Sequence, residues 1–387
     1  MSDVDIIIVG GGIVGASFAL QMRDSGAEIA IIEPKIPVPF SATDEFDHRV
    51  YALTPANINR LDSLKVFHSE DLSRLTPIRN MQIIADRNGK LNFSARNANL
   101  SELAKIVEHR LLAARLRQQL EGAQHVRMST AKLTKVQQND KQVTVVSATG
   151  QEWCASLLVG ADGGDSWVRN ECGFALKVKD YDQVGLVANF RCELSHEYTA
   201  RQWFSRDSVL AWLPLPEGCI SIVWSVKADR GAALLSMPPA EFCDAVCEAG
   251  GNTLGAMQLL SPVAKFPLRW QRSEPTVQGR VVLIGDAAHS MHPLAGQGLN
   301  LGLQDAAMLA QTLNNKHLPE GYGDHSVLRR YERVRKQPIV AMQSVTDGLQ
   351  RLFGSESTIL AAVRNSGLTL TDHAGWLKRL LIREALG

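Results

Sequence analysis

Short apolar runs near the start of the chain predict buried strands. Residues 6–9 (Ile-Ile-Ile-Val) lead directly into glycines, and a helical pattern then extends over about residues 13–25. Gly26 ends this pattern, and a second apolar run occupies residues 29–32. Strands of a parallel sheet are buried on both faces, so they carry no polar alternation. Residues 1–35 are therefore predicted to form a β-α-β unit.

The later pattern indicates elements that interleave rather than two domains in series. A stretch rich in proline and polar residues over 36–48 predicts a loop. Apolar residues at helical spacing predict an amphipathic helix over residues 101–120. Further strands are predicted over residues 78–95, 125–149, 157–163, 184–226 and 281–284. Further helices are predicted in three places: one that ends near residue 64, one over residues 238–249, and others from residue 299 onward.

Length and composition restrict the class of protein. The chain has 387 residues, 45% hydrophobic and 21% charged, which predicts a globular protein of about two domains. Lys and Arg number 41 against 40 Asp and Glu, so no basic field favours nucleic acid as a partner. The six cysteines lack metal-ligand spacing, which predicts reduced thiols, no metal site and a cytoplasmic location. We expect neither a signal peptide nor a membrane-spanning segment.

The first glycine-rich turn has the spacing of a dinucleotide-binding fingerprint. Gly10 permits a tight turn, Gly12 lets the backbone approach a pyrophosphate, and Gly15 lets the helix pack close to the strand. Glu33 follows the second strand, about where a ribose-binding carboxylate is expected. The alternative is an ordinary βα turn with a surface glutamate. The residues predicted to form this half of a site are Gly10, Gly12, Ile13, Val14, Gly15 and Glu33.

A second glycine-rich turn follows the apolar run at 281–284. Asp286 lies at the C-terminal end of that strand, where α/β sheets bind ligands, and would hydrogen-bond a sugar-like hydroxyl such as the ribityl chain of a flavin. The dipole of the helix after Gly298 would stabilise negative charge on a reduced flavin. Two such turns favour FAD over NAD, whereas helix capping without a ligand is the alternative. This second half comprises Gly285, Asp286, Pro293, Gly296, Gln297, Gly298, Leu299 and Asn300.

Three motifs, in this order, resemble those of the FAD-dependent aromatic hydroxylases of the p-hydroxybenzoate hydroxylase type. They are the first turn with Glu33, the segment 161–169 (Ala-Asp-Gly-Gly-Asp-Ser-Trp-Val-Arg) and the segment 285–289 (Gly-Asp-Ala-Ala-His). Residues 292–305 resemble the signature of the ubiquinone-biosynthesis hydroxylase subfamily throughout. The resemblance extends over essentially the whole chain.

The resemblance implies roles for individual residues. Glu33 would bind the adenosine ribose, Arg49 would reach the FAD pyrophosphate, and Asp286 would hold the ribityl chain. Residues 296–300 would border the isoalloxazine ring.

Other parts of the implied site are less specific. Asp162 and Gly163 would support the pyrophosphate region and, as in relatives, the docking of NAD(P)H. Where relatives place an FAD-contacting Arg, Gln or Asn, this chain has His109 followed by Arg110. These two residues either contact FAD or lie on the surface.

No general base stands out in the sequence. His289, His292 and Pro293 are catalytic candidates because they lie near the implied flavin, but packing or capping is the favoured interpretation of the histidines. The aromatic strands over residues 203–224 would line a substrate pocket or form a core, and both interpretations remain open.

The resemblance implies an FAD-dependent monooxygenase. It would hydroxylate the ring of a polyprenylated phenol in ubiquinone biosynthesis, using O₂ and NADH or NADPH, by way of a flavin hydroperoxide. Another flavin reaction on the same fold, such as isoprenoid reduction or halogenation, is an alternative. A flavin-binding accessory protein without turnover is a third.

The implied fold is α/β: a Rossmann-like FAD-binding domain interleaved with a mixed-sheet substrate domain, followed by C-terminal helices. The FAD-binding domain would comprise residues 1–76, 101–180 and 276–325. The substrate-binding sheet domain would comprise 77–100 and 181–275, and the C-terminal helical region 326–387.

A polyprenyl substrate implies access to a membrane. Residues 376–383 place apolar side chains on one helical side and basic ones on the other, as an interfacial helix would, although docking of this helix on the core is the favoured alternative. Peripheral contact at the inner membrane face, a complex with other ubiquinone-biosynthesis proteins and a homo-oligomer are the partner hypotheses.

Overall fold

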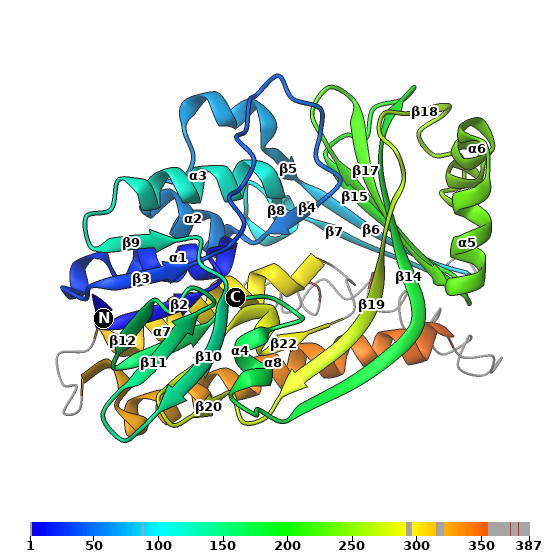
Figure 1. The fold of residues 1–387 in the computed structure, drawn as a ribbon. Helices are drawn as coiled ribbons and strands as arrows, with labels where there is room; N and C mark the ends of the chain where they lie inside the picture. The colour runs from blue at the N-terminus through cyan, green and yellow to red at the C-terminus, as the bar shows by residue number, and fades with distance from the viewer. Residues whose placement is uncertain are drawn as a thin grey trace.

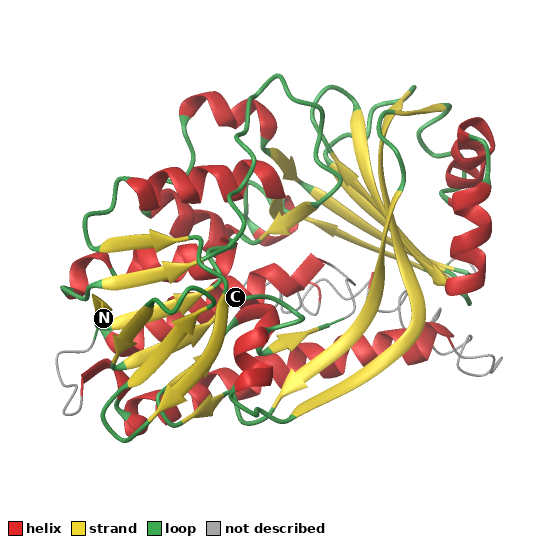
Figure 2. Cartoon of the chain, viewed as in Figure 1, coloured by secondary structure: helices red, strands yellow, loops and turns green. Residues whose placement is uncertain are grey.

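The computed structural model describes residues 2–86, 89–291, 296–314 and 321–354, together with residues 372 and 378. Strands gather in two regions of the molecule, and helices lie against both (Figure 2). The long helix α8 (His325–Gly354) passes beneath both regions (Figure 1).

A six-stranded sheet forms the centre of the first region. Its order is β20-β21-β13-β2-β3-β9, and all neighbouring pairs except β20 with β21 are parallel. The strands are β2 (Ile6–Val9), β3 (Ile29–Ile32), β9 (Val126–Ser129), β13 (Leu157–Gly160), β20 (Val277–Gln278) and β21 (Val281–Leu283). The predicted β-α-β unit is confirmed, with α1 over Ile13–Gln21, a 3-10 turn over Arg23–Ser25 and Gly26 in the left-handed conformation.

Alternate residues of β2 face opposite sides of this sheet, and each side has its own core. Ile6 and Ile8 pack with α1, α3 (His109–Glu121) and α7 (Gln297–Leu313). Ile7 and Val9 pack on a four-stranded sheet made of β1 (Ser2–Asp3), β12 (Glu152–Ala155), β11 (Val143–Ser147) and β10 (Leu133–Gln138). Because both sides are covered, the strand is apolar at every position.

The structure corrects the helix predicted over residues 101–120. Residues Ala104–Glu108 form strand β8, and α3 begins only at His109. β8 pairs antiparallel with β4 (Val50–Leu53) and β5 (Thr76–Ile78), which supply the backbone hydrogen bonds that a helix would make internally. Ile106 and Val107 then pack into different cores. The predicted helix that ends near residue 64 is confirmed as α2 (Pro55–Ser63).

A large, mostly antiparallel sheet forms the second region, in the order β22-β19-β14-β17-β16-β15-β6-β7, with β18 also paired to β14. Its strands are β6 (Asn80–Ala85), β7 (Lys90–Ser94), β14 (Leu176–Cys192), β15 (Thr199–Phe204), β16 (Ser208–Pro214), β17 (Cys219–Lys227), β18 (Met257–Leu259), β19 (Ala264–Ser273) and β22 (His289–Ser290). The helices α5 (Ala228–Ser236) and α6 (Pro239–Ala249) lie against its outer face (Figure 1). Residues 289–290, just after the second glycine turn, thus extend this sheet through β19.

The aromatic side chains of the large sheet belong to its core. Trp212 and Trp224 are each 1% exposed and pack with Phe190 and with Phe242 of α6. Trp203 joins this side, since its ring centroid lies 4.4 Å from that of Trp212. Of the two interpretations of these strands, the core is therefore correct for these aromatic residues, and they do not line a substrate pocket.

The C-terminal region is described only in part. No helix among the described residues is long and apolar enough to cross a membrane. Residues 376–383, predicted as an interfacial helix, lie outside the described residues except for Lys378. The Lys378 ammonium group contacts Asp372 at 2.9 Å, and Asp372 also accepts a hydrogen bond from the backbone of Asn92 in β7. These two residues therefore touch the large sheet.

The aromatic core predicts a specific stability effect. Phe242→Ala removes a ring that is 2% exposed and stacks 6.1 Å from Phe190, so it should destabilise the protein by about 3–5 kcal/mol. Thermal denaturation followed by circular dichroism measures this loss. Asp244→Ala, at an exposed position of the same helix, is the matched control and should leave the midpoint almost unchanged. Equal midpoints for both variants would contradict the core assignment.

Candidate cofactor-binding site

The glycines of the first turn have different structural tasks. Gly10 has φ +102°, and a Cβ there would lie 2.4 Å from the Ala161 carbonyl oxygen. A Cβ on Gly15 would lie 2.0 Å from the Gly10 oxygen, so this residue allows α1 to approach the strand. A Cβ on Gly12, by contrast, would meet no atom within 4 Å. Gly12 is the N-cap of α1 and makes no side-chain capping bond, so the helix start is open to a ligand.

Glu33 lies beside this turn, at the end of β3. Its Oε2 accepts a hydrogen bond of 2.9 Å from the Gly11 backbone, and its Oε1 accepts one of 2.9 Å from the Lys35 backbone. The carboxylate is thereby fixed next to the glycine turn before any ligand is present. Its position at the strand end agrees with the sequence pattern.

The two distant glycine turns meet in space, as predicted. Val14 of α1 is the contact, because a Cβ on Gly285 would lie 3.2 Å from its side chain and a Cβ on Gly302 only 2.8 Å. Ile13 beside it is buried in the core under the sheet. Residues 10–15 and 285–302 therefore border one place in the molecule.

A buried carboxylate holds the second turn. Asp305 of α7 accepts hydrogen bonds from the Gly285 backbone (3.0 Å), from His289 Nε2 (2.6 Å) and from Arg335 Nε (2.6 Å). Burial by itself raises the pKa of Asp305, but the charges and hydrogen bonds of His289 and Arg335 outweigh burial and lower it. His289 is 2% exposed and committed to this carboxylate, which supports packing rather than catalysis.

Sequence reasoning missed the roles of Asp305 and Arg335. Asp305 closes the recognised segment 292–305, so its place in the motif was the available signal. Arg335 lies 30 positions further along the chain, too far for a local pattern to pair the two residues.

Asp286 lies in the short 3-10 turn Gly285–Ala287 that follows β21. Its side chain is accessible to solvent, yet the surrounding protein encloses it. Burial raises the pKa of Asp286, and the positive charges of His289 and Arg49 oppose that rise. A carboxylate that is both accessible and enclosed is placed to receive the hydroxyl groups of a ligand.

The segment 161–169 braces the two turns against each other. Asp162 accepts hydrogen bonds from the Ser166 hydroxyl (2.5 Å) and the Val168 backbone (3.0 Å), which fixes the start of α4 (Trp167–Glu171). Arg169 is 3% exposed and donates to the carbonyls of Gly164 (2.8 Å) and Ala287 (3.1 Å). Gly163 turns the chain with φ +84°. The Asp162 carboxylate therefore forms hydrogen bonds within the protein that fix this segment.

The start of α7 is open like that of α1. Gly296 is its N-cap, with φ +62° and no side-chain capping bond, and a Cβ on Gly298 would meet no atom within 4 Å. Gln297 and Leu299 lie half-buried beside them. His292 and Pro293 lie outside the described residues.

Asn300 has a role that the sequence did not reveal. Its Oδ1 accepts from the Thr54 backbone (3.0 Å) and from Asn57 Nδ2 (2.8 Å), and its Nδ2 donates to the Ala52 carbonyl (2.8 Å). The side chain is 1% exposed and clamps α7 to β4 and α2. Its backbone carbonyl also accepts from Asn57 Nδ2 at 3.2 Å, so the side chain is not available for the predicted contact with a flavin ring.

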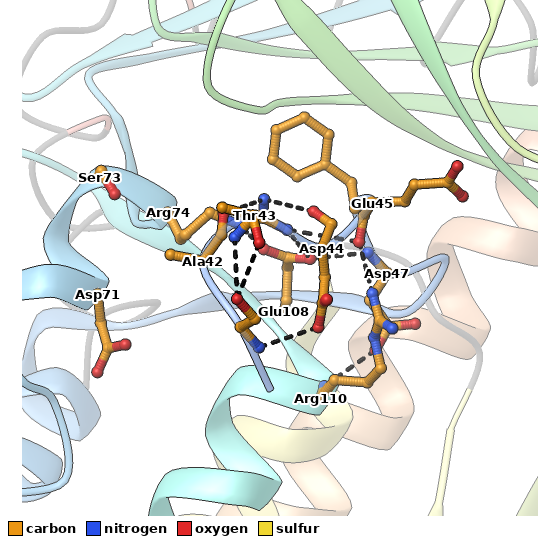
Figure 3. Close-up of polar contacts among 12 residues, drawn as sticks. Ala42, Thr43, Asp44, Glu45, Asp47, Asp71, Ser73, Arg74, Glu108 and Arg110 are labelled. Atoms are coloured by element: carbon orange, nitrogen blue, oxygen red, sulfur yellow. Dashed lines mark hydrogen bonds and ion pairs between the residues drawn. The ribbon is translucent and has the colours of Figure 1, made fainter. Parts of the chain in front are cut away.

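The loop before β4 leads to Arg49, and we define its residues 40–49 as the strap. Arg74 makes a two-pronged ion pair with Glu108, at 2.7 and 2.9 Å, and donates to the carbonyls of Ala42, Asp44 and Glu45 in the strap (Figure 3). Glu108 also accepts from the Asp47 backbone at 2.7 Å. Both charged side chains are almost fully buried. The buried Arg74–Glu108 pair therefore anchors the backbone of the strap.

The strap ends at Arg49, which is one of the predicted site residues. Arg49 is exposed, and its charge acts on Tyr51, His109 and Asp286, which brings these four residues into one neighbourhood. The His109 ring contacts the Tyr51 hydroxyl at 3.1 Å. Burial is the main cause that lowers the pKa of His109, and the positive charge of Arg49 lowers it further.

Arg110 differs from its neighbour His109. Its backbone donates to Asp47 and its guanidinium to the Glu45 carbonyl, so the strap occupies it (Figure 3). Among the described residues, no group of His, Cys, Asp and Glu could hold a metal ion. The open helix starts, an exposed arginine and an enclosed carboxylate instead fit an anionic group linked to hydroxyl-bearing chains.

Comparisons with known proteins agree with this chemistry. The family described as FAD binding domain matches residues 3–346. The 3-demethoxyubiquinol 3-hydroxylase of Escherichia coli is 32% identical over 385 residues, covering 99% of this chain and 98% of that protein. The ubiquinone hydroxylase UbiL of Rhodospirillum rubrum is 31% identical over 387 residues, covering 99% and 89%. The human mitochondrial ubiquinone biosynthesis monooxygenase COQ6 is 30% identical over 438 residues, covering 98% and 92%.

Solved structures show the same fold at lower identity. The p-nitrophenol 4-monooxygenase PnpA of Pseudomonas putida superposes with a TM-score of 0.79 at 17% identity, covering 100% of this chain and 99% of that one. Klebsiella pneumoniae HpxO, a variant solved with FAD, gives 0.74 at 18% identity, covering 98% and 99%.

Asp286 gives a prediction about pH. Burial raises its pKa in the folded, ligand-free protein above the unfolded value of about 3.9, so ionisation destabilises the fold at neutral pH. Asp286→Asn cannot ionise and should raise the melting temperature of the ligand-free protein at pH 7. The gain should vanish as pH falls below about 4, because the parent carboxyl is then protonated in both states.

Melting temperatures of ligand-free protein across this pH range test the prediction. Asp62→Asn, at an exposed position of α2, is the control and should show no such gain. A melting temperature for Asp286→Asn that matches the parent at every pH would show that Asp286 is not desolvated.

Proposed function

This chain belongs to the FAD binding domain family, and we propose that it is an FAD-dependent monooxygenase. It hydroxylates the aromatic ring of a polyprenylated phenol in ubiquinone biosynthesis, with O₂ and with NADH or NADPH as electron donor. The observation that carries the proposal is that Gly12, Asp286 and Arg49 border one site, in a chain similar over nearly its whole length to hydroxylases of that pathway.

The residues of the site fit FAD. We propose that the open start of α1 at Gly12 and the Arg49 guanidinium bind the pyrophosphate, Glu33 the adenosine ribose, and Asp286 the ribityl chain. The backbone over residues 296–300 borders the flavin ring. FAD, when bound, takes electrons from NAD(P)H and activates O₂ for transfer of one oxygen atom.

The remaining candidates keep narrower roles in this proposal. Asp162, Gly163 and Arg169 position the second turn rather than contact FAD through their side chains. His109 lines the site beside Arg49, whereas Arg110 and His289 support the strap and the turn. We propose no general base.

The arrangement of the sheets supports the proposed division into domains. Residues 1–76, 101–180 and 276–325 supply every strand of the six-stranded sheet, and we propose that they form the FAD-binding domain. Residues 77–100 join 181–275 in the large sheet because β6 pairs with β15, and we propose that these form the substrate domain. Residues 326–387 form the proposed C-terminal helical region.

A polyprenylated substrate places the reaction beside a membrane. We propose that the protein works in the cytoplasm and meets its substrate at the inner membrane face, either directly or through other proteins of the pathway. Flotation of the protein with anionic vesicles, with and without those proteins, separates the two routes.

Product analysis tests the function. The chain should restore one ring hydroxylation when expressed in bacterial strains that are each blocked at a single ring position, as read by mass spectrometry of the quinone intermediates. The purified protein should be yellow and should release FAD, not FMN, on heating. NAD(P)H oxidation without hydroxylated product in any strain would contradict the proposal and favour an accessory flavoprotein.

Gly12 tests how the cofactor is held. Gly12→Val places a side chain at the open start of α1, where a Cβ meets no protein atom, so the protein should fold but retain little FAD. Gly122→Val, at the end of α3 and away from the site, is the matched control and should retain FAD. Flavin absorbance per protein after gel filtration measures retention. Parent-like retention by Gly12→Val would move the pyrophosphate away from α1.

A further inference from the structure

The inner face of the large sheet carries a row of three aliphatic side chains and one glutamine. Val187, Val223, Ala211 and Gln202 are directly paired across β14, β17, β16 and β15, so they point to the same side. We define these four residues as the central strip. Their chain neighbours, such as Trp212 and Trp224, point the other way into the core under α5 and α6. The central strip therefore faces away from those helices.

The sheet is covered on either side of the central strip but less so at the strip itself. In the direction of the strap, Ala200 and Leu213 pack in a cluster that includes Ala52. In the other direction, Phe204 packs on Phe353 of α8, with ring centroids 4.1 Å apart. Between them, the three aliphatic residues of the strip are only half-buried.

The cluster that contains Ala52, on the strap side of the strip, lies beside the proposed flavin position. A Cβ on Gly296 would lie 3.8 Å from Ala52, so the start of α7 touches the cluster that borders the strip. The strip is thus a half-open aliphatic surface close to where the flavin ring is proposed to lie. An aromatic ring with an apolar chain suits such a surface.

Gln202 is the one polar residue of the strip. It is 9% exposed, and its side-chain amide has no hydrogen-bond partner among the described residues, whereas the adjacent Gln82 accepts one from Arg201 at 3.2 Å. In the next row, Asn189 and Ser221 are 0% exposed, so the protein itself covers them. The Gln202 amide is not among the unpaired polar atoms that are shut off from solvent, so it is open at the surface of the strip and free to hydrogen-bond a ligand.

We propose that Gln202 contacts the substrate and sets the position of its ring, an inference that rests on the proposed function. The amide oxygen accepts a hydrogen bond from a phenol hydroxyl, and the amide nitrogen donates to an oxygen on the neighbouring ring carbon. Val187, Ala211 and Val223 contact the apolar part of the same molecule. Gln202 thereby selects rings that carry oxygen and fixes which ring carbon faces the flavin.

The test pairs a variant of the protein with a variant of the ligand. Gln202→Leu keeps the volume and removes both hydrogen-bonding groups, and Gln202→Met is a second such variant. Gln258→Leu, at the exposed central position of β18 in the same sheet, is the matched control. The ligands are a phenol with a short prenyl chain and the matching prenylbenzene, which lacks the hydroxyl. Dissociation constants come from the change in flavin absorbance, and kcat/KM from hydroxylated product.

The expected pattern is specific to a substrate contact. Gln202→Leu should retain parent-like FAD content and lose about tenfold in affinity and kcat/KM for the phenol. It should bind the prenylbenzene as the parent does or more tightly, and product per NAD(P)H consumed should fall because the ring is held less well. The control should match the parent in every measurement.

Other outcomes overturn the inference. Equal losses for phenol and prenylbenzene would mean that Gln202 acts on the fold rather than on the ring oxygen. If both Gln202 variants keep the parent kcat/KM and the parent forms product normally, Gln202 does not contact the substrate, but the proposed function stands. Absence of hydroxylated product from the parent with any prenylated phenol would remove the proposed function and this inference together.

Discussion

The second glycine turn depends on one buried charge, the carboxylate of Asp305. It joins the Gly285 backbone, His289 and Arg335, and so ties together α7, α8 and the strand that enters the large sheet. Removing one partner of a buried ion pair destabilises a protein by about 3–5 kcal/mol, so these elements hold their places together. Asp286 is consequently fixed in position before a ligand arrives, which reduces the entropy lost on binding.

The same principle applies on the other side of the site. The Arg74–Glu108 pair is buried and completed by carbonyl and amide groups of the strap, so its charges organise the backbone instead of binding a ligand. Asn189 of the large sheet also donates to the strap, at the Phe46 and Asp47 carbonyls. The strap that carries Arg49 is therefore held by both regions of the molecule. A shift of one region against the other would displace Arg49.

Local patterns predicted the first turn well because its strand, helix and glycines are consecutive. The prediction of a helix over residues 101–120 was correct from His109 onward but wrong for residues 104–108. The apolar spacing there fits a strand as well as a helix, and the partners that make β8 a strand lie up to 58 residues earlier. Alternation in the large sheet indicated two faces but not which one faced the helices, so the place of Trp212 stayed open. The family resemblance identified Asn300 and Asp162, but their hydrogen bonds depend on residues distant in the chain or in the turn. The structural roles of these two side chains therefore could not be read from the local sequence.

The distance along the chain between the two turns affects how the protein is synthesised. Gly12 and Asp286 are 274 residues apart. A ribosome that adds about 5–20 residues per second takes about 14–55 s to cover that interval. In the first half of this interval β2 lacks its neighbour β13, and in the second half β13 lacks β21, while α1 lacks α7 throughout. An apolar sheet edge therefore stays uncovered on the nascent chain. Cofactor can stabilise only the finished chain, so the incomplete one exposes apolar surface that favours aggregation.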